Sequence, residues 1–209
     1  MVRRLAVLLL LALCAVTATA MGEGDAPRIR IDTDLGAIVV ELDPVAAPVT
    51  ANHFLALVDA AVFDDGASFY RVVRLDNQPT SPVLIEVIQG GLGSGAAEAA
   101  IDPVPHETTA TTGLLHVDGA ISMARSAPGT ASSEFFICVG DQPELDFGGR
   151  RNPDGQGFAA FGRVVEGMDV VRAIQAGTTA PPPEGGDDFS GQQLAEPVAI
   201  DRIARTHHD

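Results

Sequence analysis

The chain is built from short segments in which apolar and polar residues alternate, and turn residues separate one segment from the next. The first two segments, 28–33 and 37–42, flank Asp34-Leu35-Gly36, which predicts a hairpin joined by a tight turn. Helical spacing occurs only in 50–61 and 169–176, without the strand–helix alternation of a parallel sheet. The pattern predicts an all-β barrel or sandwich with helical caps, whose further strands are 68–74, 83–89, 120–124, 134–139, 158–165 and 198–203.

Two stretches lack a sustained period. Residues 90–112 are rich in Gly, Ala, Thr and Pro, and 178–197 contain Pro181-Pro182-Pro183. We expect both to be surface loops, and long loops in a compact domain are often functional. The length of 209 residues corresponds to about one domain, and no linker or internal repeat is visible.

The first 20 residues have the order of a secretory signal peptide. A basic start at Arg3-Arg4 precedes an apolar run over 5–16, and Ala18-Thr19-Ala20 has the small-x-small pattern of a cleavage site. The run is shorter than the roughly 20 residues that a membrane-spanning helix needs, which favours cleavage over anchoring. Lipid attachment at Cys14 is an alternative that the bulky Leu13 disfavours.

This N-terminus predicts an exported protein, periplasmic or secreted, with no stable membrane insertion after cleavage. The expected organisation is a signal peptide over 1–20, a flexible segment over 21–27, one domain over 28–205 and a tail over 206–209.

The charge of the chain excludes several classes of partner. All 13 basic residues are Arg, against 28 acidic residues, and the net charge is −15. Cleavage leaves 11 arginines against 28 acidic residues, a net charge of −17. Phosphate backbones and anionic membranes repel such a protein, so no nucleic-acid partner is expected. Cleavage also leaves Cys138 as the one cysteine, in an apolar strand pattern where it behaves as a small hydrophobe.

Other kinds of site fit the residues poorly. The run Gly91-Leu92-Gly93-Ser94-Gly95 follows a strand as a phosphate-binding loop does, but no helix follows it and no Lys exists to reach a phosphate. A catalytic triad of Ser94 with His53, His106 or His116 lacks the G-x-S-x-G turn of such hydrolases. The histidines show no metal-ligand spacing, so neither a metal nor a cofactor is expected.

Five short motifs remain, and they follow one another along the chain: Phe69-Tyr70-Arg71-Val72-Val73, Val87-Ile88-Gln89-Gly90-Gly91, Ile121-Ser122-Met123-Ala124-Arg125, Ser133-Glu134-Phe135-Phe136-Ile137 and Phe158-Ala159-Ala160-Phe161-Gly162-Arg163-Val164. In this order they resemble the cyclophilin family of peptidyl-prolyl cis-trans isomerases. The likeness extends over residues 31–203, nearly the whole mature chain.

The resemblance implies a mainly β fold, a closed eight-stranded antiparallel β-barrel capped by two α-helices, with the active groove on its outer face. It implies catalytic roles for Arg71, Gln89 and Phe136. It also implies that the substrate-binding residues are Val87, Ala124, Arg125, Glu134, Leu145 and Phe158. The implied partners are proline-containing polypeptides, and the protein is expected to act as a monomer.

These residue types suit the implied reaction. Rotation about an X-Pro bond has a barrier of about 18–20 kcal/mol because the amide has partial double-bond character. A guanidinium at Arg71 can donate to the prolyl nitrogen as resonance is lost, and so bind the twisted amide better than either planar form. An apolar pocket around Phe136 would strengthen that interaction by excluding water.

Two departures from the family pattern, at Glu134 and Glu86, favour an alternative, a cyclophilin-fold binding module or chaperone with weak isomerase activity. Glu134 replaces the usual groove Gln and could pair with Arg71, while Glu86 stands where many members have Phe. Glu144 occupies the place of a Trp that binds cyclosporin, so weak binding of that drug is expected. Residues 75–82 are an insertion, and Gln89 stays aligned only if this insertion bulges outward.

Overall fold

The computed structural model describes residues 26–93, 95, 100–182, 184 and 189–206. The predicted signal peptide lies outside the described residues, as do most of the 21–27 segment and of the 206–209 tail. The strands are β1 (Arg28–Thr33), β2 (Gly36–Leu42), β3 (Ser68–Val73), β4 (Val87–Gly91), β5 (Ala120–Met123), β6 (Phe135–Cys138), β7 (Ala159–Glu166) and β8 (Gln193–Thr206). The helices are α1 (Pro48–Asp59), α3 (Thr109–Thr112) and α4 (Met168–Gln175), with short 3₁₀ turns η1 (Leu75–Asn77), η2 (Pro143–Leu145) and η3 (Ser190–Gln192).

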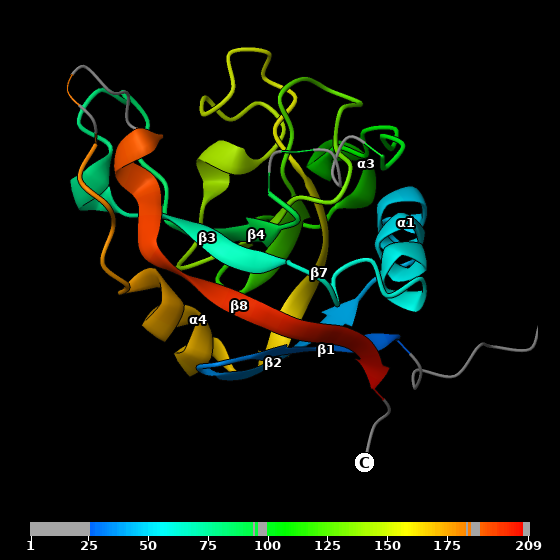
Figure 1. Cartoon of the computed structure of the whole chain (residues 1–209). Helices are drawn as coiled ribbons and strands as arrows, with labels where there is room; N and C mark the ends of the chain where they lie inside the picture. Colours follow the sequence, from blue (N-terminus) through cyan, green and yellow to red (C-terminus); the bar gives the residue numbers. More distant parts are fainter. Residues whose placement is uncertain (1–25, 94, 96–99, 183, 185–188, 207–209) are drawn as a thin grey trace, which may run out of the picture.

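The eight strands form one closed barrel (Figure 1) in the order β1-β2-β7-β5-β6-β4-β3-β8, and every neighbouring pair is antiparallel. The prediction of a closed eight-stranded barrel is therefore confirmed, and the sandwich alternative is wrong. Alternation explains which side chains enter the barrel: Ile29 and Ile31 of β1 have no exposed surface, while Arg30 between them points to solvent.

Aromatic rings fill the interior of the barrel. Phe135 makes edge-to-face contacts with Phe54, Phe63 and Phe69 at centroid distances of 5.3, 6.0 and 5.7 Å, and Phe161 lies 5.1 Å from Phe54. Helix α1 brings Phe54 to this cluster and packs against β7 and β8, while α4 packs against β2, β3 and β4. The barrel interior is thus closely packed with side chains, so a binding site can lie only on the outer side of the barrel wall, which this core supports.

Several predicted boundaries are wrong for reasons that the contacts show. Strand β4 begins at Val87 rather than 83, because the side-chain amide of Gln78 bonds both the N–H and the C=O of Ile85 and takes the place of a strand partner. Strand β8 begins five residues earlier than predicted, since its first residue, Gln193, pairs with Arg71 of β3.

The helices also differ from the prediction. Helix α1 begins two residues early, at Pro48, whose fixed φ and missing N–H suit a first helical turn. The stretch expected to be loop over 90–112 contains α3, which ends at Gly113 with a φ of 74°. The two expected caps are therefore joined by a third short helix.

Cys138 is fully buried in β6 and burial raises the pKa of its thiol, which confirms its prediction as a small hydrophobe. Among the described helices, none is long and apolar enough to cross a membrane.

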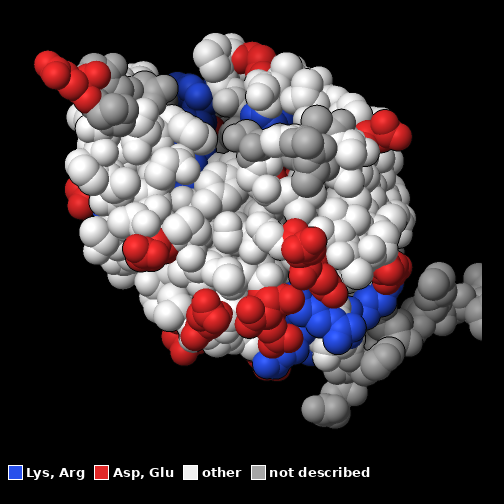
Figure 2. Space-filling model, viewed as in Figure 1, with Lys and Arg blue, Asp and Glu red and all other residues white. Residues whose placement is uncertain are grey.

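On the face shown in Figure 2, arginines and acidic residues lie side by side. Among the described residues, Arg30 of β1 bonds Asp32 at 2.7 Å and Arg205 of β8 bonds Asp59 at 2.6 Å. These exposed pairs neutralise charge locally and contribute little to stability.

Candidate active site

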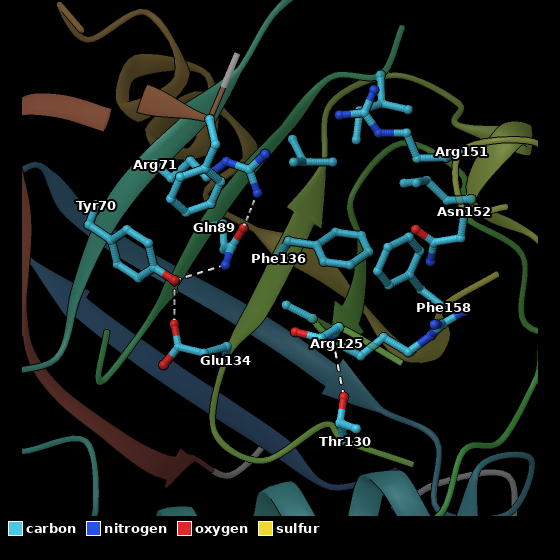
Figure 3. A pocket seen from close by; sticks show the side chains of 16 residues that line it. Tyr70, Arg71, Gln89, Arg125, Thr130, Glu134, Phe136, Arg151, Asn152 and Phe158 are labelled. Atoms are coloured by element: carbon cyan, nitrogen blue, oxygen red, sulfur yellow. Dashed lines mark hydrogen bonds between the residues drawn. The ribbon is translucent and has the colours of Figure 1, made fainter. Parts of the chain in front are cut away.

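A groove of about 520 Å³ lies against the outer side of the barrel wall, over strands β3, β4 and β6. Its wall is the outward face of these strands: on β6, Phe135 points into the barrel and its neighbour Phe136 points into the groove. The nine residues implied by the resemblance all line it, namely Arg71, Val87, Gln89, Ala124, Arg125, Glu134, Phe136, Leu145 and Phe158 (Figure 3). Residues more than 80 positions apart are therefore brought to one surface by the strand order.

The guanidinium of Arg71 is held in a fixed plane at one side of the groove. Arg71 and Gln89 are opposite each other in the β3–β4 register, and Arg71 Nη1 donates to Gln89 Oε1 at 2.7 Å. From the other side, Nε and Nη2 both donate to Gln192 Oε1, at 3.0 and 2.6 Å. The ring of Phe189 lies 4.4 Å from the guanidinium carbon, a cation–π contact.

Gln192 and Phe189 were not predicted as site residues. Both belong to the stretch before β8 that has no hydrophobic period, and Gln192 lies 121 positions after Arg71. The pairing of β3 with β8 brings this stretch to Arg71. No pattern in the sequence predicts which strand pairs with β3 at this point.

Aromatic rings form the apolar end of the groove. Phe136 and Phe158 meet edge to face at 5.2 Å, and His116 stacks on the other side of Phe136 at 5.8 Å. Val87 and Leu145 belong with Phe136 to a second buried cluster outside the barrel. Phe136, Phe158, Val87 and Leu145 together form a rigid apolar surface, called the apolar seat below. It lies beside the fixed guanidinium of Arg71.

His116 supports this seat from below. One ring nitrogen is 2.7 Å from Asp146 Oδ1 and the other is 2.9 Å from Ser122 Oγ, the spacing of a nucleophilic triad. However, Ser122 is fully buried and His116 is 1% exposed, so no substrate carbonyl can reach the serine. We assign the three residues a structural role beneath Phe136.

Glu134 is engaged with Tyr70. The Tyr70 hydroxyl donates to Glu134 Oε2 at 2.5 Å and accepts from Gln89 Nε2 at 2.8 Å. Burial, together with the nearby Glu134 charge, raises the pKa of Tyr70 well above its usual value. The sequence left open a pairing of Glu134 with Arg71; the carboxylate bonds the tyrosine, while Arg71 bonds the two glutamines.

The model of the family "Cyclophilin type peptidyl-prolyl cis-trans isomerase/CLD" matches residues 28–203. The chain belongs to the cyclophilin family. A peptidyl-prolyl cis-trans isomerase of Streptomyces antibioticus is 35% identical over 148 residues, 70% of this chain and 82% of that protein. Peptidyl-prolyl cis-trans isomerase B of Escherichia coli is 32% identical over 152 residues, 72% of this chain and 85% of that protein.

A solved cyclophilin type isomerase of Cryptosporidium parvum has the same fold, with a TM-score of 0.64 at 19% identity, covering 88% of this chain and 99% of that chain. A second structure of that protein, in the presence of the dipeptide Ala-Pro, gives a TM-score of 0.62. The structural comparison therefore shows the same fold that the family match of the sequence indicates.

The departures from the family pattern have different consequences in this cyclophilin. Glu86 is not among the described groove-lining residues, because Ile85 and Val87 on either side of it face the groove. Glu144 lies in another depression, where it forms a salt bridge with Arg150 at 2.6 Å. Of the three glutamates, only Glu134 reaches the groove.

The insertion over 75–82 leaves Gln89 aligned with Arg71, and it has a fixed structure of its own. Arg151, from the segment after η2, donates to Gln78 Oε1 at 3.0 Å and to Ser81 Oγ at 2.6 Å. Gln89 thus keeps its register with Arg71. The insertion itself is bonded to Arg151, which lines the groove.

Arg125 lines the groove, yet its side chain is only 1% exposed. Both terminal nitrogens bond the Asp154 carboxylate, at 2.8 and 2.9 Å, and Nε bonds the carbonyl of Gly157 at 2.9 Å. The guanidinium also lies 5.2 Å from the Phe158 ring. Arg125 therefore ties the 154–158 segment to the groove wall and sets the position of Phe158.

The ion pair between Arg125 and Asp154, called the clamp below, predicts that the stability it contributes to the fold depends on pH. The hydrogen bond from Arg125, followed by the Gln156 N–H, lowers the pKa of Asp154 to about 2. Because the unfolded value is higher, about 3.9, the clamp contributes its full stabilisation above that value and loses it as the pH falls toward 2. An NMR titration of the Gln156 amide is expected to show a midpoint near 2.

The control for this titration is Asp154→Asn, in which the transition of the Gln156 amide should vanish. A midpoint near 3.9, the unperturbed value, would show that the clamp does not form in solution.

Proposed function

We propose that this cyclophilin accelerates X-Pro rotation in exported client proteins, and that Arg71 stabilises the twisted amide. The observation that carries the proposal is the placement of one fixed guanidinium beside one apolar seat, both lining the same groove. Catalysis of this rotation needs neither a nucleophile nor a cofactor, because no bond is broken; it needs an environment that binds the twisted amide better than the planar one.

The proline ring is proposed to lie against Phe136 and Phe158, with Val87 and Leu145 around it. The seat excludes water from the ring and leaves the preceding amide near the edge that Arg71 occupies. As the amide twists, its nitrogen gains a lone pair that can accept an N–H from the guanidinium. Gln89 and Gln192 orient the cation through neutral carbonyl oxygens, which leave its charge in place.

The direct test is isomerisation of an Ala-Pro peptide by the mature chain and by its Arg71→Ala variant. Activity in the first and loss in the second supports the proposal. If both are equally slow while refolding of a proline-containing client is still helped, the protein is a cyclophilin-fold binding module or chaperone instead. Glu134→Gln is expected to change activity measurably, because Glu134 lines the groove.

Export is proposed from the first 20 residues. A basic start, an apolar run and a small-x-small pattern together support cleavage after Ala20, with periplasmic or secreted location and a net charge of −17 that favours a soluble monomer. Expression of the full chain in a Gram-negative bacterium should yield a periplasmic protein whose mass corresponds to a start at Met21. Ala20→Leu should block the cleavage, and a lipid-bearing Cys14 would contradict the proposal.

A further inference from the structure

The glycine run that begins at the last residue of β4 holds the carboxylate of Glu134. Gly91 has a φ of +146°, and a Cβ at this position would overlap the carboxylate of Glu134. Two residues later, the N–H of Gly93 donates to Glu134 Oε1 at 3.0 Å. Glycine is thus required for backbone conformation and for close approach at once. This cradle accounts for Gly91 and Gly93 of the run that resembles a phosphate-binding loop.

The cradle fixes the direction of the hydrogen bonds that run from Glu134 through Tyr70 and Gln89 to Arg71. With Glu134 Oε1 bonded to Gly93, Glu134 Oε2 accepts the Tyr70 proton. The tyrosine oxygen can then only accept from Gln89, which turns the Gln89 NH₂ toward Tyr70 and its carbonyl toward Arg71. Figure 3 shows this chain of side chains along one wall of the groove.

We infer that Tyr70 and Glu134 are positioning residues for the isomerase reaction: they lock the Gln89 amide so that its carbonyl holds Arg71. The inference rests on the proposed role of Arg71. If the amide of Gln89 turned by 180°, its NH₂ would face the N–H donors of Arg71, and Arg71 Nη1 would lose the acceptor that holds the guanidinium from the side opposite Gln192. The negative charge of Glu134, at the start of this series of hydrogen bonds, strengthens the bonds that follow it.

The first test removes single atoms or charges from the chain of bonds. Tyr70→Phe deletes the hydroxyl alone, and we expect the on-enzyme exchange rate of an Ala-Pro peptide to fall about tenfold, as for loss of a charge-assisted hydrogen bond. The peptide Kd should stay within about twofold, because the aromatic seat is untouched. NMR exchange spectroscopy measures both quantities.

Variants of Glu134 separate its acceptor from its charge. Glu134→Gln keeps an oxygen for the Tyr70 hydroxyl, so we expect a smaller loss of about threefold. Glu134→Leu removes the acceptor and should match Tyr70→Phe. Glu196→Gln, an exposed position on β8, is the matched control and should behave as the wild type.

The decisive measurement is a double-mutant cycle. If Tyr70 acts through Gln89 and Arg71, Tyr70→Phe should cause no further loss in an Arg71→Ala background, whereas a general structural defect would lower both backgrounds equally. Full activity of Tyr70→Phe beside an inactive Arg71→Ala overturns this inference alone. Full activity of Arg71→Ala overturns the proposed function, whatever Tyr70→Phe does.

Discussion

Replacement of Arg71 by alanine is expected to lower kcat/KM for an Ala-Pro peptide by about two to three orders of magnitude, the usual loss when one donor to a developing charge is removed. The effect should appear in the on-enzyme rate far more than in peptide affinity, because the donor is needed when the amide is twisted. The apolar seat of Phe136 and Phe158 remains in the variant.

The measurement is the rate of cis-trans exchange at equal folded concentration, with far-ultraviolet circular dichroism as the check on folding. Arg202→Ala is a suitable control, since Arg202 is exposed and its distance of 3.9 Å from Asp64 makes the ion pair a loose one. A loss of less than about threefold, under 1 kcal/mol, in Arg71→Ala would contradict the assigned role. A similar loss in the control would indicate a general effect of net charge.

Strands could be predicted from the sequence where they carry an alternating signal of their own, whereas the closed eight-stranded barrel is what the family resemblance implies. Alternation places Ile29 and Ile31 inside with Arg30 outside, whereas every residue of β5 and β6 is buried. Strand ends were less predictable, since they depend on partners far along the chain. Strand β4 loses its first residues to the side chain of Gln78, and a side chain that competes for backbone groups leaves no periodic trace.

Only those groove residues that match the family pattern could be predicted from the sequence. The resemblance places nine residues on one surface, eight of them in the motifs, and all nine lie there. The motifs do not show Phe189 and Gln192, whose contact with Arg71 depends on how β8 closes the barrel. Nor do they show that Arg125 is nearly buried in a clamp with Asp154, because a motif carries residue types and not their partners.

The second large effect is expected on strand β6, where two neighbouring phenylalanines face opposite sides of the barrel wall. Phe135 has no exposed surface and touches three other rings in the interior. Phe135→Ala should therefore lower the free energy of unfolding by about 4 kcal/mol, the sum of lost burial and a cavity that the closed barrel cannot collapse. The melting temperature should fall by about 12 °C.

Phe136→Ala should give the opposite balance of effects. The space left by this ring opens to the groove, where water can fill it, so the expected stability loss is only about 2 kcal/mol. The site proposed for the proline ring loses its main contact surface, and kcat/KM should fall about 30-fold, the same free energy expressed as a rate. Calorimetry and peptide exchange on the two variants test the pair together. If Phe135→Ala lost more activity per folded molecule than Phe136→Ala, the substrate would not bind in this groove, since the two rings share a strand and differ in the face they occupy.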